Sequence, residues 1–198
     1  VAARVVWCGV HNGPWRGVVS AASYEARPYG VRSAMPISRA ARLCPHAAFL
    51  PVDMEKYERV SVQVMGILVE FSPLVEPVSV DEAFVDLTGT ESLFGRPPAA
   101  VRLIRRRILD ETGLTASAGL AANKFVAKVA SELGKPDGLV VVTAGDEARF
   151  LGELSIERLW GVGKVMAKAL GDLGFTRIGQ LQKEAPGVLA PRLPKQGA

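Results

Sequence analysis

The chain has 198 residues, of which 48% are hydrophobic and 22% are charged, a balance that excludes a largely disordered chain and is typical of a globular protein. Its net charge of +4 favours an anionic partner without requiring one. No apolar run approaches the roughly 20 residues that span a membrane, so no membrane partner is expected. The cysteines Cys8 and Cys44 form no Cys-x-x-Cys pair, which predicts reduced thiols in a cytoplasmic protein.

The first quarter of the chain predicts short strands and one short helix. Residues 1–6 favour a strand, and an Asn-Gly-Pro turn signal follows within 11–15. Residues 17–24 predict a buried strand whose small side chains let another group approach the backbone. Residues 37–43 predict a helix that ends before a proline. The start of the chain lacks both an initiating Met and the basic region of a signal peptide, so we expect it to lie inside a longer chain.

The middle of the chain predicts helices and strands in the order helix, strand, strand, helix, strand, helix, strand. The expected helices begin at the capping residues Asp53 and Asn123, and two of them end at the glycines Gly113 and Gly134. This order predicts an α+β layer, with an antiparallel sheet and its helices on one face. The expected elements lie at residues 53–72, 75–88 (two strands), 101–113, 114–121, 123–133 and 139–142.

Asp81 and Glu82 stand between the two strands of 75–88. Adjacent carboxylates repel each other unless solvent or a cation lies nearby. The pair is therefore either a solvated acidic turn or a site for a hard cation, since Mg²⁺ favours one or two carboxylates plus substrate phosphates. Two such ions would serve phosphoryl transfer.

Basic residues gather in two other segments. Tyr24, Arg27 and Arg32 can hold a phosphate, unless Glu25 merely pairs with an arginine at an ordinary surface. Downstream, Lys124 and Lys128 share a helix face that is either a solvated basic surface or part of a site. Lys135 precedes Pro-Asp-Gly, a tight turn that fixes its place.

Two short helices are expected to flank Gly161-Val162-Gly163, with Lys164 just beyond. Exposed N–H groups at the start of the second helix, together with the lysine charge, can bind a DNA phosphate. The alternative is a plain pair of antiparallel helices.

These segments together resemble Y-family, translesion DNA polymerases of the bacterial polymerase IV type. The resemblance covers roughly residues 17–182. Its motifs stand in the family's order: ASYEARPYGVRSAMPISRAARLCP, SVDEAFVDLTG, GLTASAGLAANKFVAKVASELGKPDG and LWGVGKVMAKAL.

The resemblance implies a right-hand polymerase with fingers in residues 1–52, a ferredoxin-like palm in 53–143 and a helix-hairpin-helix thumb in 144–198. It implies Mg-dependent addition of deoxynucleotides to a primer terminus, with primer-template DNA, deoxynucleoside triphosphates and a sliding clamp as partners. The implied roles are as follows: Asp81 and Glu82 are the catalytic metal ligands, Tyr24, Arg27 and Lys135 bind the triphosphate, and Gly161, Gly163 and Lys164 bind DNA.

The chain also departs from the family pattern. Residues 1–16 contain no acidic residue, so the first palm strand with its aspartate ligand and steric gate is missing, and one ligand of the two-ion site with it. The little finger, through which the clamp would bind, is missing too, and Ala21 stands where many relatives carry a hydroxyl. We therefore expect this fragment to be inactive alone. Two alternatives stay open: a non-catalytic Y-family adaptor, and a helix-hairpin-helix DNA-binding module.

Overall fold

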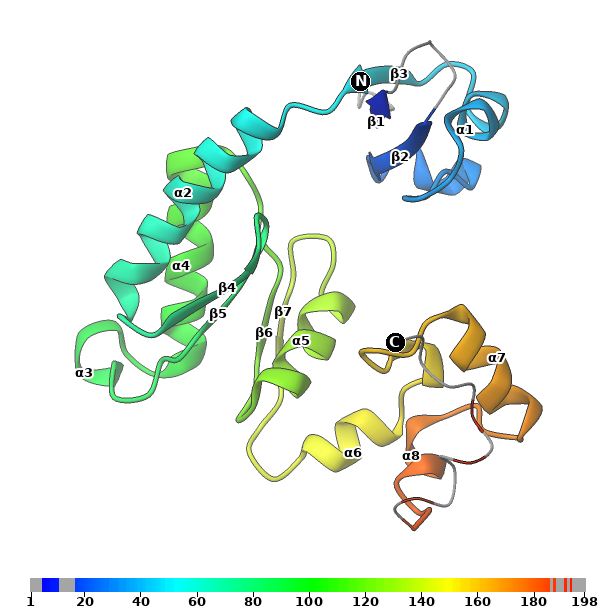
Figure 1. Cartoon of the computed structure of the whole chain (residues 1–198). Helices are drawn as coiled ribbons and strands as arrows, with labels where there is room; N and C mark the ends of the chain where they lie inside the picture. Colours follow the sequence, from blue (N-terminus) through cyan, green and yellow to red (C-terminus); the bar gives the residue numbers. More distant parts are fainter. Residues whose placement is uncertain (1–4, 11–16, 186, 188–190, 192, 194–198) are drawn as a thin grey trace. The chain divides into compact units, whose positions relative to one another are not determined.

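The computed structural model of the chain describes residues 5–10, 17–185, 187, 191 and 193 (Figure 1). The chain divides into two compact units, residues 1–59 and 60–198. The expected turn at 11–15 and the first four residues of the expected strand at 1–6 lie outside the described residues. None of the described helices is both long and apolar enough to cross a membrane.

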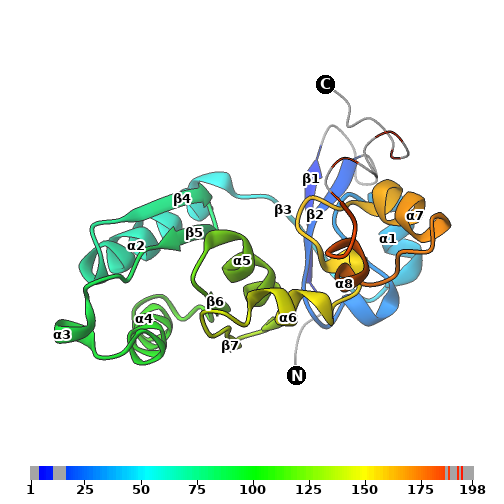
Figure 2. The same cartoon turned by 90° about the horizontal axis from the view of Figure 1, so that it is seen from below.

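In its described residues, the first unit contains a three-stranded sheet, the helix α1 and the first residues of the helix α2. The strands run side by side (Figure 2), with β1 in the centre, β2 antiparallel to it and β3 parallel to it. The predicted helix at 37–43 is confirmed and packs on β2, where Val19 is 1% exposed. The elements are β1 (Val5–Val10), β2 (Gly17–Ala22), the 3-10 turn η1 (Arg27–Tyr29), α1 (Ile37–Leu43) and β3 (Ala48–Pro51).

The predicted helices and strands of the middle region are all present. Asp53 Oδ1 accepts the Lys56 N–H at 3.0 Å and so caps the first helix, and Asn123 Oδ1 accepts the Val126 N–H at 2.9 Å at the start of α5. Gly113 ends α4 with a left-handed φ of 71°. The elements are α2 (Met54–Phe71), β4 (Val75–Ser79), β5 (Glu82–Val85), α3 (Glu91–Phe94), α4 (Pro97–Thr112), β6 (Ala118–Leu120), α5 (Lys124–Leu133) and β7 (Leu139–Val141).

The expected single antiparallel sheet with helices on one face is wrong in two respects. β4 and β5 pair antiparallel, but β6 and β7 pair parallel, and the two pairs share no hydrogen-bonded ladder in the described residues. The reason is the path of α5: the helix returns the chain to the same end of the sheet, which makes β6-α5-β7 a crossover unit. A crossover helix must lie on a face of its strands, and α5 lies on the face opposite α4 (Figure 1).

Residue alternation in the strands explains why both faces are covered. Ala118 and Leu120 pack into the core formed by α2 and α4, whereas Gly119, between them, faces α5. The same alternation in β5 sends Ala83 and Val85 into that core. Glu82 and Phe84 therefore project from the face where α5 lies.

The remainder of the second unit is built from short helices. The bounds are α6 (Glu147–Gly152), the 3-10 turn η2 (Ile156–Arg158), α7 (Lys164–Asp172) and α8 (Ile178–Leu181). The short helix expected before the hairpin at Gly161 is the 3-10 helix η2, and the helix after it is α7. Among the described residues of this region, the buried ones are Ile156, Leu170 and Ile178.

Candidate functional site

Asp81 and Glu82 lie at the turn from β4 into β5, as the sequence predicted. The Ser79 hydroxyl donates to Asp81 Oδ1 at 2.7 Å, which orients that carboxylate at the turn. Asp81 is exposed, and the Glu82 side chain is 34% exposed. Among the described residues, no arginine pairs with either carboxylate. Both can therefore be reached by a cation from solvent.

The side of this turn that faces α5 is lined by lysines. Lys128 Nζ donates to Glu82 Oε1, and its side chain is only 18% exposed. Lys124, one helical turn earlier, pairs with Glu76 on β4 and lies 5.8 Å from the centre of the Phe84 ring. The solvated-face alternative is thus wrong for Lys128. The spacing placed both lysines on one face, but it did not indicate that this face opposes the acidic hairpin.

The ion pairs of α5 shift the pKa of two of its residues. Burial acts to lower the pKa of Lys128, but the hydrogen bonds and charges of Glu82 and Glu132 outweigh it and raise the pKa. Burial acts to raise the pKa of Glu132, but hydrogen bonds and charges from Lys135 and Lys128 lower it instead. These pairings keep Lys128 protonated and Glu132 ionised at neutral pH.

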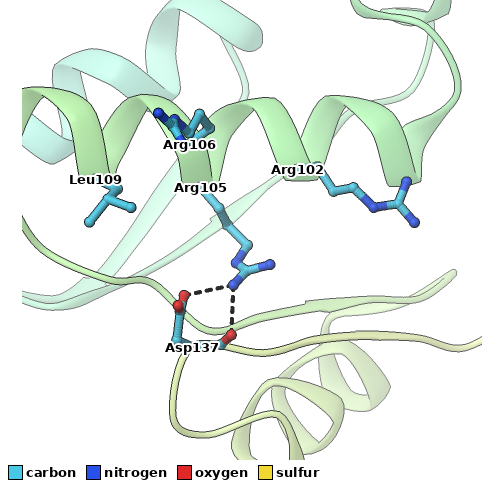
Figure 3. Close-up of a pocket in the computed structure, with 5 residues that line it drawn as sticks. All are labelled: Arg102, Arg105, Arg106, Leu109 and Asp137. Atoms are coloured by element: carbon cyan, nitrogen blue, oxygen red, sulfur yellow. Dashed lines mark hydrogen bonds and ion pairs between the residues drawn. The ribbon is translucent and has the colours of Figure 1, made fainter.

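Lys135 is held at the end of α5 by a well-anchored turn. Its Nζ donates to Glu132 Oε1 at 2.6 Å, and the side chain is 41% exposed. Two residues on, Asp137 is clamped from α4: Arg105 Nη2 donates to its carbonyl oxygen at 2.8 Å and to its Oδ1 at 2.7 Å (Figure 3). Arg105 Nε donates to the carbonyl of Ala116 at 2.7 Å. The turn that carries Lys135 is therefore tied to both α4 and the approach to β6.

The pocket in Figure 3 lies at this clamp and contains none of the predicted site residues. Its lining is Arg102, Arg105, Arg106, Leu109 and Asp137. Arg105 directs its Nε and Nη2 to Ala116 and Asp137, so its part in this pocket is to anchor the turn.

Tyr24 and Arg27 lie together in the first unit. The Arg27 guanidinium sits 4.0 Å from the centre of the Tyr24 ring, and its Nε donates to the carbonyl of Ala22 at 3.2 Å. Arg32 donates to the backbone carbonyls of Arg27 and Val31, so its hydrogen bonds stabilise the backbone of this loop. Glu25 forms no ion pair with any described residue, so the pairing weighed for it is not found. Lys135 belongs to the second unit, and its convergence with Tyr24 and Arg27 stays a prediction.

An aromatic cluster that the sequence did not indicate lies beside the acidic hairpin. The Trp160 ring lies 6.5 Å from that of Phe84 and 6.1 Å from that of Phe125, measured between ring centres. Trp160 is still 50% exposed. Strand alternation and helical spacing describe Phe84 and Phe125 only locally, and neither pattern indicates that Trp160 lies beside both rings.

The loop after Trp160 has the backbone form that the glycines suggested. Gly161 has a φ of 91°, a left-handed conformation that favours glycine, and Gly163 is the N-cap of α7. Lys164, the first residue of α7, is exposed. The N–H groups at the start of α7 and the Lys164 side chain are thus available to an anion.

No other described acidic residue is placed to join Asp81 and Glu82. Asp53 caps α2. Asp86 Oδ1 accepts the hydroxyl of Thr88 at 2.6 Å and its N–H at 2.9 Å, and these hydrogen bonds lower the pKa of Asp86. Within the described residues there is no group of three or more His, Cys, Asp or Glu side chains that can hold a metal.

Family models match most of the chain. The impB/mucB/samB family model matches residues 4–132, and the model of its helix-hairpin-helix motif matches residues 144–175. The chain belongs to the impB/mucB/samB family. The helix-hairpin-helix predicted around Gly161 lies within the second match.

Curated relatives of this family member agree with the resemblance read from the sequence. It is 48% identical over 182 residues to DNA polymerase IV of Desulfatibacillum aliphaticivorans, covering 92% of this chain and 46% of that protein. It is 48% identical over 166 residues to DNA polymerase IV of Halorhodospira halophila, covering 84% of this chain and 47% of that protein. The chain thus spans about half the length of the relatives it matches.

Solved structures confirm the fold. An insertion ternary complex of Dbh DNA polymerase superposes with a TM-score of 0.87 at 32% identity, covering 97% of this chain and 56% of that one. DinB of Sulfolobus solfataricus superposes with a TM-score of 0.85 at 31% identity, covering 93% and 54%. The α+β prediction and the assignment to Y-family polymerases are therefore confirmed.

Proposed function

We propose that this chain is the nucleotidyl-transfer part of a translesion DNA polymerase, which adds deoxynucleotides to a primer terminus on a damaged template. The observation that carries the proposal is the open carboxylate pair Asp81-Glu82 at a strand turn, in a family whose relatives are named DNA polymerase IV. A non-catalytic adaptor would have no need of this pair. A DNA-binding module would leave both the carboxylates and the α5 lysines without a role.

The donor set at the turn fits Mg²⁺. Two carboxylates are hard oxygen ligands, and one oxygen of each is engaged, by Ser79 and by Lys128, which leaves the second oxygen of each for a cation. Asp81 and Glu82 would hold the ion. When bound, Mg²⁺ neutralises charge on the transferring phosphoryl group.

The chain's own cations would orient the substrate. Lys135, fixed on its clamped turn, would contact the triphosphate. Tyr24 would donate its hydroxyl, and Arg27, whose guanidinium lies over the Tyr24 ring, would donate its N–H groups to phosphate oxygens. Gly161, Gly163 and Lys164 would hold the DNA backbone, independently of sequence. These contacts position the primer hydroxyl and the α-phosphate, which is the main contribution a protein makes to this reaction.

The proposal is tested in a chimera, because the chain spans only about half of its relatives. Residues 17–182 of this chain replace the matching segment of the Halorhodospira halophila polymerase, and primer extension is measured with Mg²⁺ and four deoxynucleotides. We expect extension that Asp81→Asn lowers about a hundredfold or more, because charge stabilisation in the transition state is lost. The matched control is Asp110→Asn, which removes an exposed carboxylate paired only with Arg106 on α4.

A chimera whose extension is the same with Asp81→Asn as without it would refute the assignment of the metal ligands. The chain alone is expected to give no extension, since among the described residues no third acidic side chain joins Asp81 and Glu82 in a group that can hold a metal. Robust extension by the chain alone that depends on Asp81 would show that other metal ligands exist.

A further inference from the structure

Four side chains form an alternating row of charges along α5. Lys128 Nζ donates both to Glu82 Oε1 and, at 3.3 Å, to Glu132 Oε1. The same Glu132 oxygen accepts from Lys135 Nζ at 2.6 Å. The row Glu82–Lys128–Glu132–Lys135 thus joins the acidic turn to the lysine of the Pro-Asp-Gly turn.

The backbone of α5 and of the turn that carries Lys135 is held in place. α5 lies directly against β6, where a Cβ at Gly119 would stand 2.0 Å from the Ala127 carbonyl oxygen. Asn123 fixes the start of the helix, and Arg105 fixes the turn beyond its end through Asp137. The row can therefore respond to a ligand only by exchange of side-chain partners.

The two middle residues are each shared between two partners. Lys128 divides its charge between Glu82 and Glu132, and Glu132 accepts Lys128 and Lys135 on a single oxygen. An anion that takes Lys135 leaves Glu132 with Lys128 alone. Lys128 is then drawn toward Glu132, and its hold on Glu82 weakens. The Lys128 side chain is only 18% exposed, so water offers little compensation for these exchanges.

We propose that Lys128 and Glu132 are positioning residues that couple the two ends of the site, so that engagement of Lys135 by a polyphosphate strengthens divalent-cation binding at Glu82. This proposal rests on the proposed function, because it takes Asp81-Glu82 as the cation site. The device makes the carboxylate available in step with the arrival of the nucleotide. Coupling of this kind is reciprocal: a cation on Glu82 releases Lys128 to Glu132 and thereby frees Lys135 for phosphate.

The test omits nucleotide, since a triphosphate would itself bind the metal. Lys135→Met takes Lys135 away from Glu132 in the same way that a phosphate would. The ¹⁵N-labelled chain is titrated with Mn²⁺, and the paramagnetic broadening of the Asp81 and Glu82 amide signals gives the apparent Kd. The same spectra show that each variant is folded.

We expect Lys135→Met to tighten Mn²⁺ binding about fivefold. Lys124→Met is the matched control: it removes the same charge from the other end of α5, but Lys124 pairs with Glu76 outside the row, so its effect should be smaller. In a Glu132→Gln background, where the link is cut, Lys135→Met should no longer tighten binding beyond the Lys124→Met effect.

Equal effects of Lys135→Met and Lys124→Met would overturn the coupling, because simple removal of charge would then explain both. A full Lys135→Met effect that persists with Glu132→Gln would overturn it as well. Broadening at Asp81 and Glu82 that no variant changes would refute the coupling and leave the cation site standing. Absence of Mn²⁺ broadening at these residues in the unchanged chain would refute the cation site itself, and the coupling with it.

Discussion

Gly119 on β6 is the position where a single methyl group should disturb both the fold and the site. A Cβ there would lie 2.0 Å from the carbonyl oxygen of Ala127 and 2.5 Å from the amide nitrogen of Ser131, both backbone atoms of α5. Ordinary contact begins at 3.4 Å, so α5 would have to retreat by about 1.4 Å, the difference between 3.4 and 2.0 Å. No side-chain rotation can relieve a clash with backbone.

We therefore expect Gly119→Ala to lower the free energy of unfolding by about 3 kcal/mol, the upper end for overpacking in a core. At about 2–4 °C per kcal/mol for a domain of this size, the Tm should fall by about 6–12 °C. The assay is thermal unfolding followed by circular dichroism. Retreat of α5 also moves Lys128 from Glu82, so the amide signals around residue 82 should shift.

Gly66→Ala is the matched control. Gly66 lies inside α2, and a Cβ added there would meet no atom within 4 Å, so alanine there should raise stability by about 0.5–1 kcal/mol through the backbone entropy of the unfolded chain. A Gly119→Ala chain whose Tm equals that of the unchanged chain, or of Gly66→Ala, would refute the close packing of α5 on β6.

Three further outcomes are expected. Lys164→Ala should weaken duplex DNA binding about equally for all sequences, and it should reduce the slope of log K against log salt concentration by about 1, as measured by fluorescence anisotropy. The control is Lys168→Ala, because Lys168 pairs with Asp172. An unchanged slope for Lys164→Ala would count against a phosphate contact. Because the pKa of Glu132 is lowered in the fold, its ion pairs stabilise the chain above the ordinary glutamate pKa and are lost as pH falls through the folded value. The free energy of unfolding in urea should therefore fall less between neutral and acid pH in Glu132→Gln than in the unchanged chain. An equal fall in both chains would contradict this reasoning. Arg105→Leu should lower the free energy of unfolding by about 1–3 kcal/mol, because it leaves the Ala116 carbonyl without its donor; unchanged urea unfolding would show that the clamp is dispensable.

Local rules predicted the elements of this fold but not how its layers meet. The helix at 37–43 and the caps at Asp53 and Asn123 follow from residues within a few positions of each other, and the structure confirms them. The parallel pairing of β6 with β7 follows from the path of α5, which returns the chain to the same end of the sheet. α5 packs against β6 at Gly119, where the missing side chain leaves room for the helix. The sequence showed a strand of small residues there, but not which element would use the space.

In the candidate site too, the positions of the residues follow from local sequence pattern, whereas their partners do not. Asp81 and Glu82 were located from the strand pattern around them, and the turn is where it was expected. The partners of the α5 lysines were not predictable, since Glu76 and Glu82 are more than 40 residues distant in sequence. Helical spacing places Lys124 and Lys128 on one face without indicating what that face meets. A charged face becomes interpretable only when the opposing strand is known.

The two carboxylates of the turn differ in what holds them, and this difference predicts an order of binding. Asp81 is exposed and is oriented by the neutral Ser79 hydroxyl, and no described residue forms an ion pair with it. Glu82 is compensated by Lys128, whose side chain is mostly buried. A cation therefore meets Asp81 without displacing an ion pair, whereas it must compete with Lys128 for Glu82. On the proposed function, Asp81 would therefore bind the cation first, and Glu82 would join as Lys128 is drawn toward Glu132, so that a side-chain exchange on α5 would complete the site.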